Sequence, residues 1–441
     1  MRSFINSRKN PSKTVATEIS TECVRRKISR RLLPFLSILY VIAYLDRANI
    51  AFARIPMTDE LGFSDAVFGF GAGLFFLGYL ALEIPGALIV ERHGARRWIS
   101  RIMVTWGAVT ILFAFVKTPA QFYTCRLLLG VAEAGFFPGV IVYLTHWFPR
   151  ADRTRALAVF MIGSPIALVI GGPLSALILK IQWTPVSSWR WIFILQGLAA
   201  VAFGVVTLFY LTDLPRNARW LGDAECELLE QVLRHDNPET SSRQIYWRAL
   251  AQPNVLLLCA AYTCVNIAGY GYIFWLPSAI KNTMHFTAAT ADAISILPFG
   301  LSTIALWLVA SSSDRTGRPK LHACIPMLSA SFLFALTVIP GQPAAVVLIW
   351  LCLTGAAIFA WIPGFWMLPT SIFGGGERAA SVGLINSFGC IGGFIGPWII
   401  GYFQSKDFSR YSWVVVISFS YAAAAALTAS VKMRRRIVLQ L

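Results

Sequence analysis

Charged residues are scarce in this chain. They make up 13% of its 441 residues, whereas hydrophobic residues make up 56%, and the mean hydropathy is +0.63. A soluble globular protein carries about 25% charged residues, which help to cover its surface. The composition therefore excludes a soluble globule and indicates a protein embedded in a lipid bilayer.

Motifs of common enzyme classes are also missing. The sequence contains no His-Glu-x-x-His, Gly-x-Ser-x-Gly or phosphate-loop pattern, and its five histidines are scattered. None of the eight cysteines falls in a loop predicted to lie outside the cell, so no disulfide framework is expected. No polar segment is long enough for an attached signalling domain. We expect no enzyme activity, no metal and no cofactor.

Long apolar segments are the main feature that is present. About 20 apolar residues in a helix cross the roughly 30 Å of bilayer hydrocarbon, and helices are favoured because an open strand edge is not tolerated in lipid. Twelve such segments can be counted, near residues 32–54, 66–90, 98–117, 121–148, 154–180, 189–212, 254–280, 288–311, 321–340, 344–372, 378–404 and 411–432.

The basic residues are distributed unequally between the loops. Of 38 Lys and Arg, 29 fall on the side that carries both termini and 7 on the other, while Arg47 and Arg126 lie within apolar segments. Cytoplasmic loops carry the excess of positive charge. The net charge of +17 therefore predicts cytosolic termini and contact with membrane lipids, and it does not indicate nucleic-acid binding.

One long polar interruption divides the chain into two halves. Residues 213–253 are predicted to form a cytosolic linker, with an amphipathic helix near 223–235. The other predicted regions are a cytosolic N-terminal tail (1–31), an N-terminal six-helix bundle (32–212), a C-terminal six-helix bundle (254–432) and a cytosolic C-terminal tail (433–441).

A basic, glycine-centred motif occurs once in each half. Its copies are Glu91-Arg92-His93-Gly94-Ala95-Arg96-Arg97 and Asp314-Arg315-Thr316-Gly317-Arg318-Pro319-Lys320, with their acidic residues 223 positions apart. Such a repeat indicates two halves related by duplication. The carboxylate can cap a helix and pair with an Arg, and Gly permits a tight turn. We predict a cytosolic gate formed by Glu91, Arg92, Gly94, Arg96, Arg97, Asp314, Arg315 and Gly317; the alternative is a topology anchor alone.

The motif resembles the loop signature of the major facilitator superfamily, although Glu91 replaces the more usual Asp. Further runs are similar to the anion:cation symporters, which carry organic acids. These runs are Tyr44-Leu45-Asp46-Arg47-Ala48-Asn49-Ile50, Gly94-Ala95-Arg96-Arg97-Trp98, Arg126-Leu127-Leu128-Leu129-Gly130-Val131-Ala132-Glu133-Ala134-Gly135-Phe136-Phe137-Pro138-Gly139 and Leu384-Ile385-Asn386-Ser387-Phe388-Gly389. The resemblance implies an all-α membrane protein with twelve transmembrane helices in two pseudo-symmetric six-helix bundles. Similarity to bacterial tartrate and aromatic-acid carriers suggests a bacterial inner membrane.

Ionisable residues inside the apolar segments predict the binding site. Each costs about 2.5–3.5 kcal/mol to insert, so such a residue normally faces a partner or a wet cavity. We count five, all in the N-terminal half: Asp46, Arg47, Glu83, Arg126 and Glu133.

Roles can be assigned to four of these five by their chemistry. Arg47 and Arg126 are predicted to bind a substrate carboxylate, because a guanidinium matches it with two parallel hydrogen bonds. Asp46 and Glu133 are predicted to bind the coupling protons, a role that the resemblance also implies. The alternative is a static pair, Asp46–Arg126 or Arg47–Glu133. Glu83 can be a gate, a packing contact or part of the site.

Aromatic and neutral polar residues are predicted to complete the site. Tyr44 and Tyr79 can donate hydroxyl hydrogen bonds, Trp366 can form a cavity wall, and Asn386 can bind the substrate. The family run typically continues Asn-Ser-x-Gly-Asn, but here Cys390 takes the place of the second Asn. Loss of that amide favours a less hydroxylated acid, either aromatic or a small dicarboxylate.

The sequence thus predicts a monomeric, proton-coupled importer of a small organic acid anion. Two bundles would rock about a central site. The alternative is an exporter or exchanger of the same fold, since Gly171-Gly172-Pro173 partly resembles the glycine-proline signature of antiporters.

Overall fold

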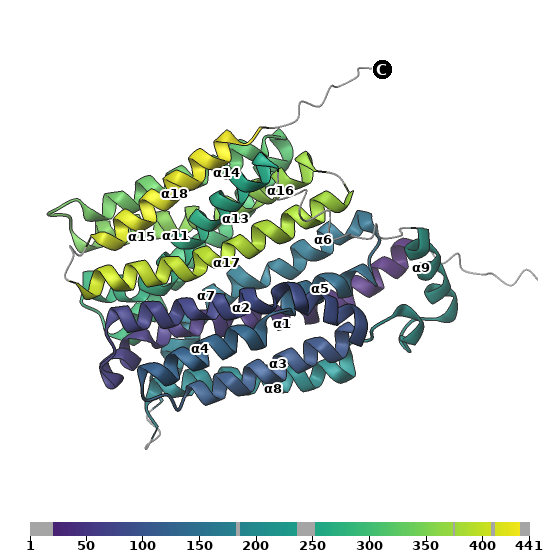
Figure 1. Cartoon of the computed structure of the whole chain (residues 1–441), viewed down its shortest axis with the longest axis horizontal. Coiled ribbons are helices and arrows are strands. Elements are labelled where there is room, and N and C mark those ends of the chain that lie inside the picture. Colours follow the sequence, from purple (N-terminus) through teal and green to yellow (C-terminus); the bar gives the residue numbers. More distant parts are fainter. Residues whose placement is uncertain (1–20, 182–185, 236–251, 374, 407–410, 433–441) are drawn as a thin grey trace, which may run out of the picture.

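Almost all of the described chain is helical (Figure 1). The computed structural model describes residues 21–181, 186–235, 252–373, 375–406 and 411–432. The N-terminal helices are α1 (Thr21–Leu61), α2 (Asp65–His93), α3 (Ala95–Phe113), α4 (Pro119–Glu133), α5 (Phe136–Thr145), α6 (Arg150–Met161), α7 (Gly163–Ile178) and α8 (Ser188–Tyr210). After α9 (Asp223–His235), the C-terminal helices are α11 (Pro253–Met284), α12 (Ala288–Ile294), α13 (Ile296–Thr316), α14 (Pro319–Ala335), α15 (Ala344–Ala360), α16 (Ile362–Ile372), α17 (Gly375–Ser405) and α18 (Ser412–Ser430).

Eleven helical stretches within the described residues are long and apolar enough to cross a membrane. The twelfth predicted segment corresponds to α3, whose first two turns carry Arg96, Arg97 and Arg101 and so lower its apolar character. It nevertheless packs along α8, which is one of the eleven (Figure 1). The all-α membrane fold predicted from the sequence is therefore confirmed.

Four of the predicted segments consist of two helices each. The pairs are α4 with α5, α6 with α7, α12 with α13, and α15 with α16. Between α4 and α5, Gly135 has a φ of +88°, a conformation that only glycine adopts without strain. The break lies two residues after Glu133, so α4 ends on one of the predicted site residues.

The helices form two bundles that touch along three lines. Helices α1–α8 make the N-terminal bundle and α11–α18 the C-terminal bundle (Figure 1). Between them, α2 packs along α17, α1 contacts α11, and α7 contacts α12 and α13. Helix α9 lies at one end of the bundles, called here the α9 end. The opposite end, where Leu61 and Asp65 lie, is called the far end.

Helix α1 begins earlier than the sequence predicts. It starts at Thr21, within the predicted tail 1–31, and runs to Leu61 beyond the predicted segment 32–54. Its first turns are held by ion pairs, Arg25 Nη1 with Asp152 Oδ1 at 3.0 Å and Lys27 Nζ with Glu225 Oε2 at 2.6 Å. The second of these joins α1 to α9, the helix predicted near 223–235. Residues 1–20, 236–251 and 433–441, parts of the predicted tails and linker, lie outside the described residues.

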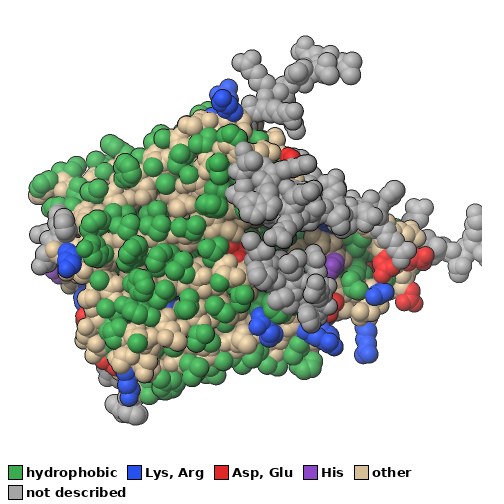
Figure 2. Space-filling model, viewed as in Figure 1, with side chains coloured by type: hydrophobic (Ala, Val, Ile, Leu, Met, Phe, Trp, Pro, Cys, Tyr) green, Lys and Arg blue, Asp and Glu red, His purple; other side chains and the backbone are tan. Residues whose placement is uncertain are grey.

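The outer surface suits lipid rather than water. Large apolar side chains are exposed, including Phe209 at 84%, Phe419 at 73% and Trp307 at 69% of their surface. Figure 2 shows hydrophobic side chains covering the middle of one face, while most charged side chains lie toward the two ends. An apolar band between two charged ends is the surface that a bilayer-spanning protein requires.

Candidate functional site

A largely buried ion pair joins α1 to α4. Arg47 Nη2 donates to Glu133 Oε1, and both side chains are largely buried. The Arg47 guanidinium also lies over aromatic rings, 5.1 Å from the ring centroid of Tyr79 and 5.8 Å from that of Tyr44. Two residues predicted to add hydroxyl donors therefore surround the predicted carboxylate-binding Arg.

Arg126 and Asp46 lie in the same interior but do not form the alternative pair. Arg126 is fully buried, donates from Nη2 to the backbone oxygen of Ala72 at 3.2 Å, and lies 5.0 Å from the ring centroid of Phe75. Asp46 accepts a hydrogen bond from Asn49 Nδ2 at 3.1 Å. No ion pair within 4.0 Å joins Arg126 to Asp46 in the described structure.

Several buried polar atoms of this cluster have no hydrogen-bond partner among the described residues. They include Nε of Arg47, Nε of Arg126 and Oε2 of Glu133. Buried polar groups in native proteins are almost always satisfied, and exceptions tend to mark sites that bind something else. Asp46 Oδ2 is a further acceptor of this kind, so the cluster has both donors and acceptors available to a polar ligand, a water molecule or a proton.

Glu83 of α2 contacts the predicted site residues of the other bundle. Asn386 Nδ2 donates to Glu83 Oε1, Ser387 Oγ donates to Oε2 at 3.2 Å, and Cys390 Sγ lies 3.9 Å from Oε2. Asn386 and Cys390 thus both lie against the same buried carboxylate. Their helix, α17, is the one that packs along α2.

Trp366 belongs to an aromatic cluster in the C-terminal bundle. Its ring centroid lies 5.2 Å from that of Tyr262 on α11, and Tyr262 also stacks against Phe365 at 5.6 Å. A side chain at Gly389 of α17 would collide with the ring of Tyr262. The absence of a Cβ there lets α17 approach the cluster next to Asn386 and Cys390.

The first copy of the repeated motif spans the N-terminus of α3. Gly94 has a φ of +83°, and Asp213 Oδ1 accepts a hydrogen bond from the Arg96 backbone nitrogen at 2.8 Å. A carboxylate at a helix N-terminus is favoured by the helix dipole. The predicted capping group, Glu91, and Arg92 have side chains outside those that the structure describes. Asp213 was missed because it lies in the linker, 117 residues from Arg96.

The other predicted gate residues lie at the molecular surface. Arg97, Asp314 and Arg315 are exposed, and Gly317 ends α13 with a φ of +64°. No ion pair of the described side chains connects these three charged residues to the opposite bundle.

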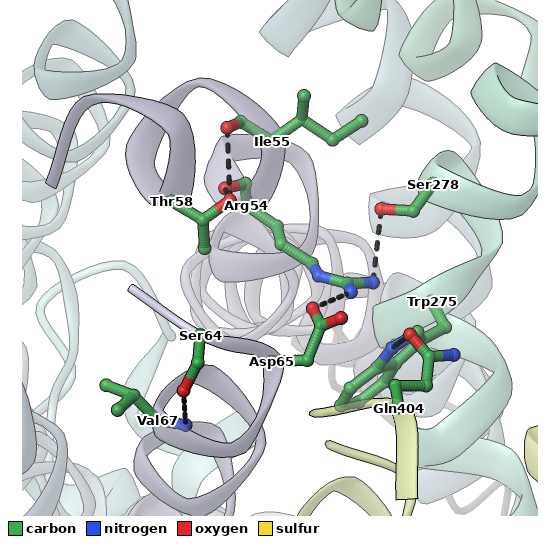
Figure 3. Close-up of polar contacts among 9 residues, drawn as sticks. All are labelled: Arg54, Ile55, Thr58, Ser64, Asp65, Val67, Trp275, Ser278 and Gln404. Carbon is green, nitrogen blue, oxygen red and sulfur yellow. Dashed lines mark hydrogen bonds and ion pairs between the residues drawn. The ribbon is translucent and has the colours of Figure 1, made fainter. Parts of the chain in front are cut away.

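Arg54, the last residue of the first predicted apolar segment (32–54), is buried although it is not among the predicted site residues. It is only 5% exposed, it pairs with Asp65 Oδ1 at 2.5 Å, and its Nη1 donates to Ser278 Oγ of α11 at 3.1 Å (Figure 3). Its guanidinium lies 4.6 Å from the ring centroid of Trp275. Arg54 thus joins the two bundles at the far end. Arg54 comes seven residues, or two helical turns, after Arg47, so the two arginines lie on the same face of α1. This spacing is the sequence signal that could have identified Arg54 as an interior residue.

A cavity of about 800 Å³ opens at the far end. Its lining includes Arg54, Asp65, Trp275, Lys281 and His285. The central charged cluster lies about 10 Å further along α1, because Arg47 is seven residues from Arg54. We place the candidate site at the central cluster, where buried charges and unpaired polar atoms meet. The far-end cavity is a separate feature, because its lining includes none of these residues.

The expectation that the C-terminal half has no ionisable residue in its helices is wrong. Asp292 of α12 is fully buried, and its backbone oxygen packs against Gly172 of α7. It lies five positions into the predicted segment 288–311, but it is not among the five ionisable residues that the sequence analysis counts. The contact between α7 and α12 brings it into the interface of the bundles.

Two bundles of membrane-spanning helices around a buried cluster of charges define a membrane transporter. The sequence matches the Major Facilitator Superfamily over residues 36–397, and the chain belongs to that family, whose members are transporters and not enzymes.

Relatives and a solved structure support this assignment. The chain is 39% identical to the "Putative tartrate transporter" of Agrobacterium vitis, covering 86% of this chain and 88% of the relative. It is 36% identical to the inner membrane transport protein RhmT of Escherichia coli (strain K12), covering 85% and 87%. The crystal structure of a bacterial homologue of the human lysosomal transporter Spinster, inward-facing and occupied, has the same fold, with a TM-score of 0.71 at 16% identity over 90% of this chain and 94% of that one.

Proposed function

We propose that this protein is a proton-coupled importer of a small organic acid anion that works by alternating access. The names of the relatives, a tartrate transporter and an inner membrane transport protein, support a carboxylate substrate and a bacterial inner membrane. From the excess of basic residues on one side, we infer that the α9 end and both termini lie in the cytosol. The moving units are the bundles 32–212 and 254–432, linked through 213–253, and the functional unit is a monomer.

The contact that carries this proposal is the ion pair of Arg47 with Glu133. A substrate carboxylate and Glu133 compete for the same guanidinium. A proton on Glu133 removes its negative charge and frees Arg47, so protonation and anion binding favour each other. Uptake against a negative-inside potential then requires at least one more proton than the charge of the substrate.

The remaining residues complete the proposed site. Arg126, whose Nε has no described partner, adds a second positive charge for the carboxylate. Asp46 is the second proton site. Tyr44 and Tyr79 orient the anion at Arg47, while Trp366, Asn386 and Cys390 bind the rest of the substrate.

The proposed gate lies at the α9 end. There, the repeated motif contributes Glu91, Arg92, Gly94, Arg96, Arg97, Asp314, Arg315 and Gly317. Since Asp314 and Arg315 are exposed here, they are available to engage the other bundle when that end closes.

Flux measurements in proteoliposomes test the coupling. Purified protein is given labelled tartrate, threonate or 4-hydroxybenzoate under an inward proton gradient, and both uptake and internal acidification are followed. Glu133→Gln should abolish gradient-driven accumulation but retain exchange of substrate across the membrane. The control is Glu227→Gln, which removes an exposed carboxylate of α9. Undiminished accumulation by Glu133→Gln would contradict the proposal, and wild-type flux that only an outward gradient accelerates would favour the exporter.

A further inference from the structure

Glu83 accepts hydrogen bonds from polar groups of α17. It is 8% exposed, and both of its carboxylate oxygens accept hydrogen bonds from the opposite bundle, Oε1 from Asn386 and Oε2 from Ser387. Two oxygens that both accept suit the ionised form, which has no donor. In that form, Glu83 brings a negative charge from the N-terminal bundle to the C-terminal side of the site.

Glu83 lies one helical turn from a residue that contacts the proposed carboxylate-binding Arg47. Glu83 and Tyr79 are four residues apart on α2, so they lie on one face of the helix, separated by one turn or about 6 Å. Tyr79 lies against Arg47. A small acid whose carboxylate binds Arg47 therefore extends toward Glu83 over the length of about four carbon atoms.

The partners of Glu83 are all neutral. Asn386, Ser387 and Cys390 lie against it, and Arg47, a cationic group that acts on it, is already paired with Glu133. A second substrate carboxylate on this side would meet Glu83 without a cation between them, and like charges in a poorly solvated site repel strongly. A hydroxyl or N–H group would instead find an acceptor.

We propose that Glu83 is a specificity-determining residue that excludes a second carboxylate from the α17 side of the site and selects monocarboxylates with a distal hydroxyl or N–H group. This inference rests on the proposed function and narrows its substrate class. It replaces the preference for a small dicarboxylate that Cys390 suggested, because Cys390 lies against a carboxylate and not against an open pocket. Binding of the distal donor to Glu83 also frees Asn386 and Ser387 from α2, which loosens one contact between the bundles.

Matched pairs of acids test this assignment. Threonate and tartrate have the same four-carbon chain and differ at one end, where a CH2OH group replaces a carboxylate; 4-hydroxybenzoate and terephthalate differ in the same sense. Affinities come from the concentration dependence of thermal stabilisation of the purified protein and from exchange flux in proteoliposomes. The wild type should bind the monocarboxylate of each pair about tenfold or more tightly than the dicarboxylate.

Glu83→Gln keeps the shape of the side chain and removes its charge. It should lower that preference about tenfold, mainly by improving the dicarboxylates, whereas Glu227→Gln on α9 should leave it unchanged. Glu83→Asp retains the charge and should retain the preference. A wild type that prefers the dicarboxylates overturns the inference without any variant, as does an unchanged ratio in a Glu83→Gln protein that still binds both acids. Absence of binding by every carboxylate overturns the proposed function itself, and with it this inference.

Discussion

Two arginines of α1, two helical turns apart, each form an ion pair with a carboxylate of another helix, but the two pairs have different surroundings. Arg47 pairs with Glu133 at the centre, and Arg54 pairs with Asp65 at the far end. Both guanidiniums lie over aromatic rings. Both arginines also reach the C-terminal bundle, Arg54 through a hydrogen bond to Ser278 and Arg47 through its interaction with the hydroxyl of Tyr270.

The difference lies in the donors of each guanidinium that are left without a partner. Arg54 has its second donor bound across the interface, so its geometry depends on contact between the bundles. Arg47 has a buried Nε without a described partner, so it has a donor available to an anion. The same pair of residue types thus suits two tasks. At the centre, a substrate anion can replace the carboxylate partner of Arg47; at the far end, Arg54 can hold the two bundles together.

The largest expected effect comes from removing the central arginine. Arg47→Ala should weaken carboxylate binding at least about hundredfold, because it removes the ligand contact and leaves Glu133 buried without a cation, a change that costs about 3–5 kcal/mol. Thermal stabilisation by threonate measures the loss. Arg47→Lys keeps the charge but not the fork of donors, and should recover only part of it. Binding by Arg47→Ala at wild-type affinity would remove Arg47 from the site.

A smaller effect is expected at the far-end pair. Arg54→Ala should leave carboxylate binding within about threefold of wild type. It should loosen the contact between the two bundles at the far end, since one hydrogen bond and one cation–π contact contribute about 1–3 kcal/mol. Ala51 lies between the two arginines on the same face of α1 and is buried. In a cysteine-free background, Ala51→Cys should react several-fold faster with a membrane-impermeant thiol reagent when Arg54 is replaced.

Two further results would decide between the interpretations of Arg54. Lys281→Ala, at the lining of the same cavity, is the control and should not change the labelling rate. If Arg54→Ala abolishes binding as completely as Arg47→Ala, the two pairs are not functionally distinct and the comparison fails.

The sequence predicts the helices because lipid leaves few alternatives for a long apolar run. It does not predict where they start or break. The first turns of α1 are basic and look like a tail, yet Lys27 finds Glu225 and the apolar Val24 and Ile28 are buried. The break at Gly135 is hidden because glycine is common in unbroken membrane helices.

For the site too, the sequence predicts features that depend on one residue but not those that depend on how helices pack. The cost of a buried charge is local, so Arg47, Arg126, Asp46 and Glu133 stand out in the sequence. Partners depend on how helices pack. Neither the contact of Glu83 with Asn386, 303 residues away, nor the burial of Arg54 against α11 follows from spacing along one helix.

The smallest expected effect concerns a third ion pair, between Lys27 of α1 and Glu225 of α9. Unlike the two pairs above, it lies near the surface at the α9 end. The hydrogen bond from Lys27 lowers the pKa of Glu225, with a second contribution from the Gly222 backbone N–H. A carboxyl whose pKa is lower in the folded state adds stability above its unfolded pKa of about 4.3, and this contribution is lost as the pH falls through the folded pKa. Because the pair is near the surface, Glu225→Gln should cost only about 0.5 kcal/mol at pH 7.

Thermal unfolding in detergent between pH 7 and pH 3 checks this sign. The difference between wild type and Glu225→Gln should be largest at pH 7 and should shrink as the pH falls below about 4.3. Glu227→Gln, which removes an exposed carboxylate from the same helix, should show no such trend. A difference that persists unchanged at pH 3 would mean that Glu225 acts through packing and not through its charge.

High salt should reduce the effect at Glu225 but leave the buried Arg47–Glu133 pair nearly unchanged, since screening acts on exposed charges.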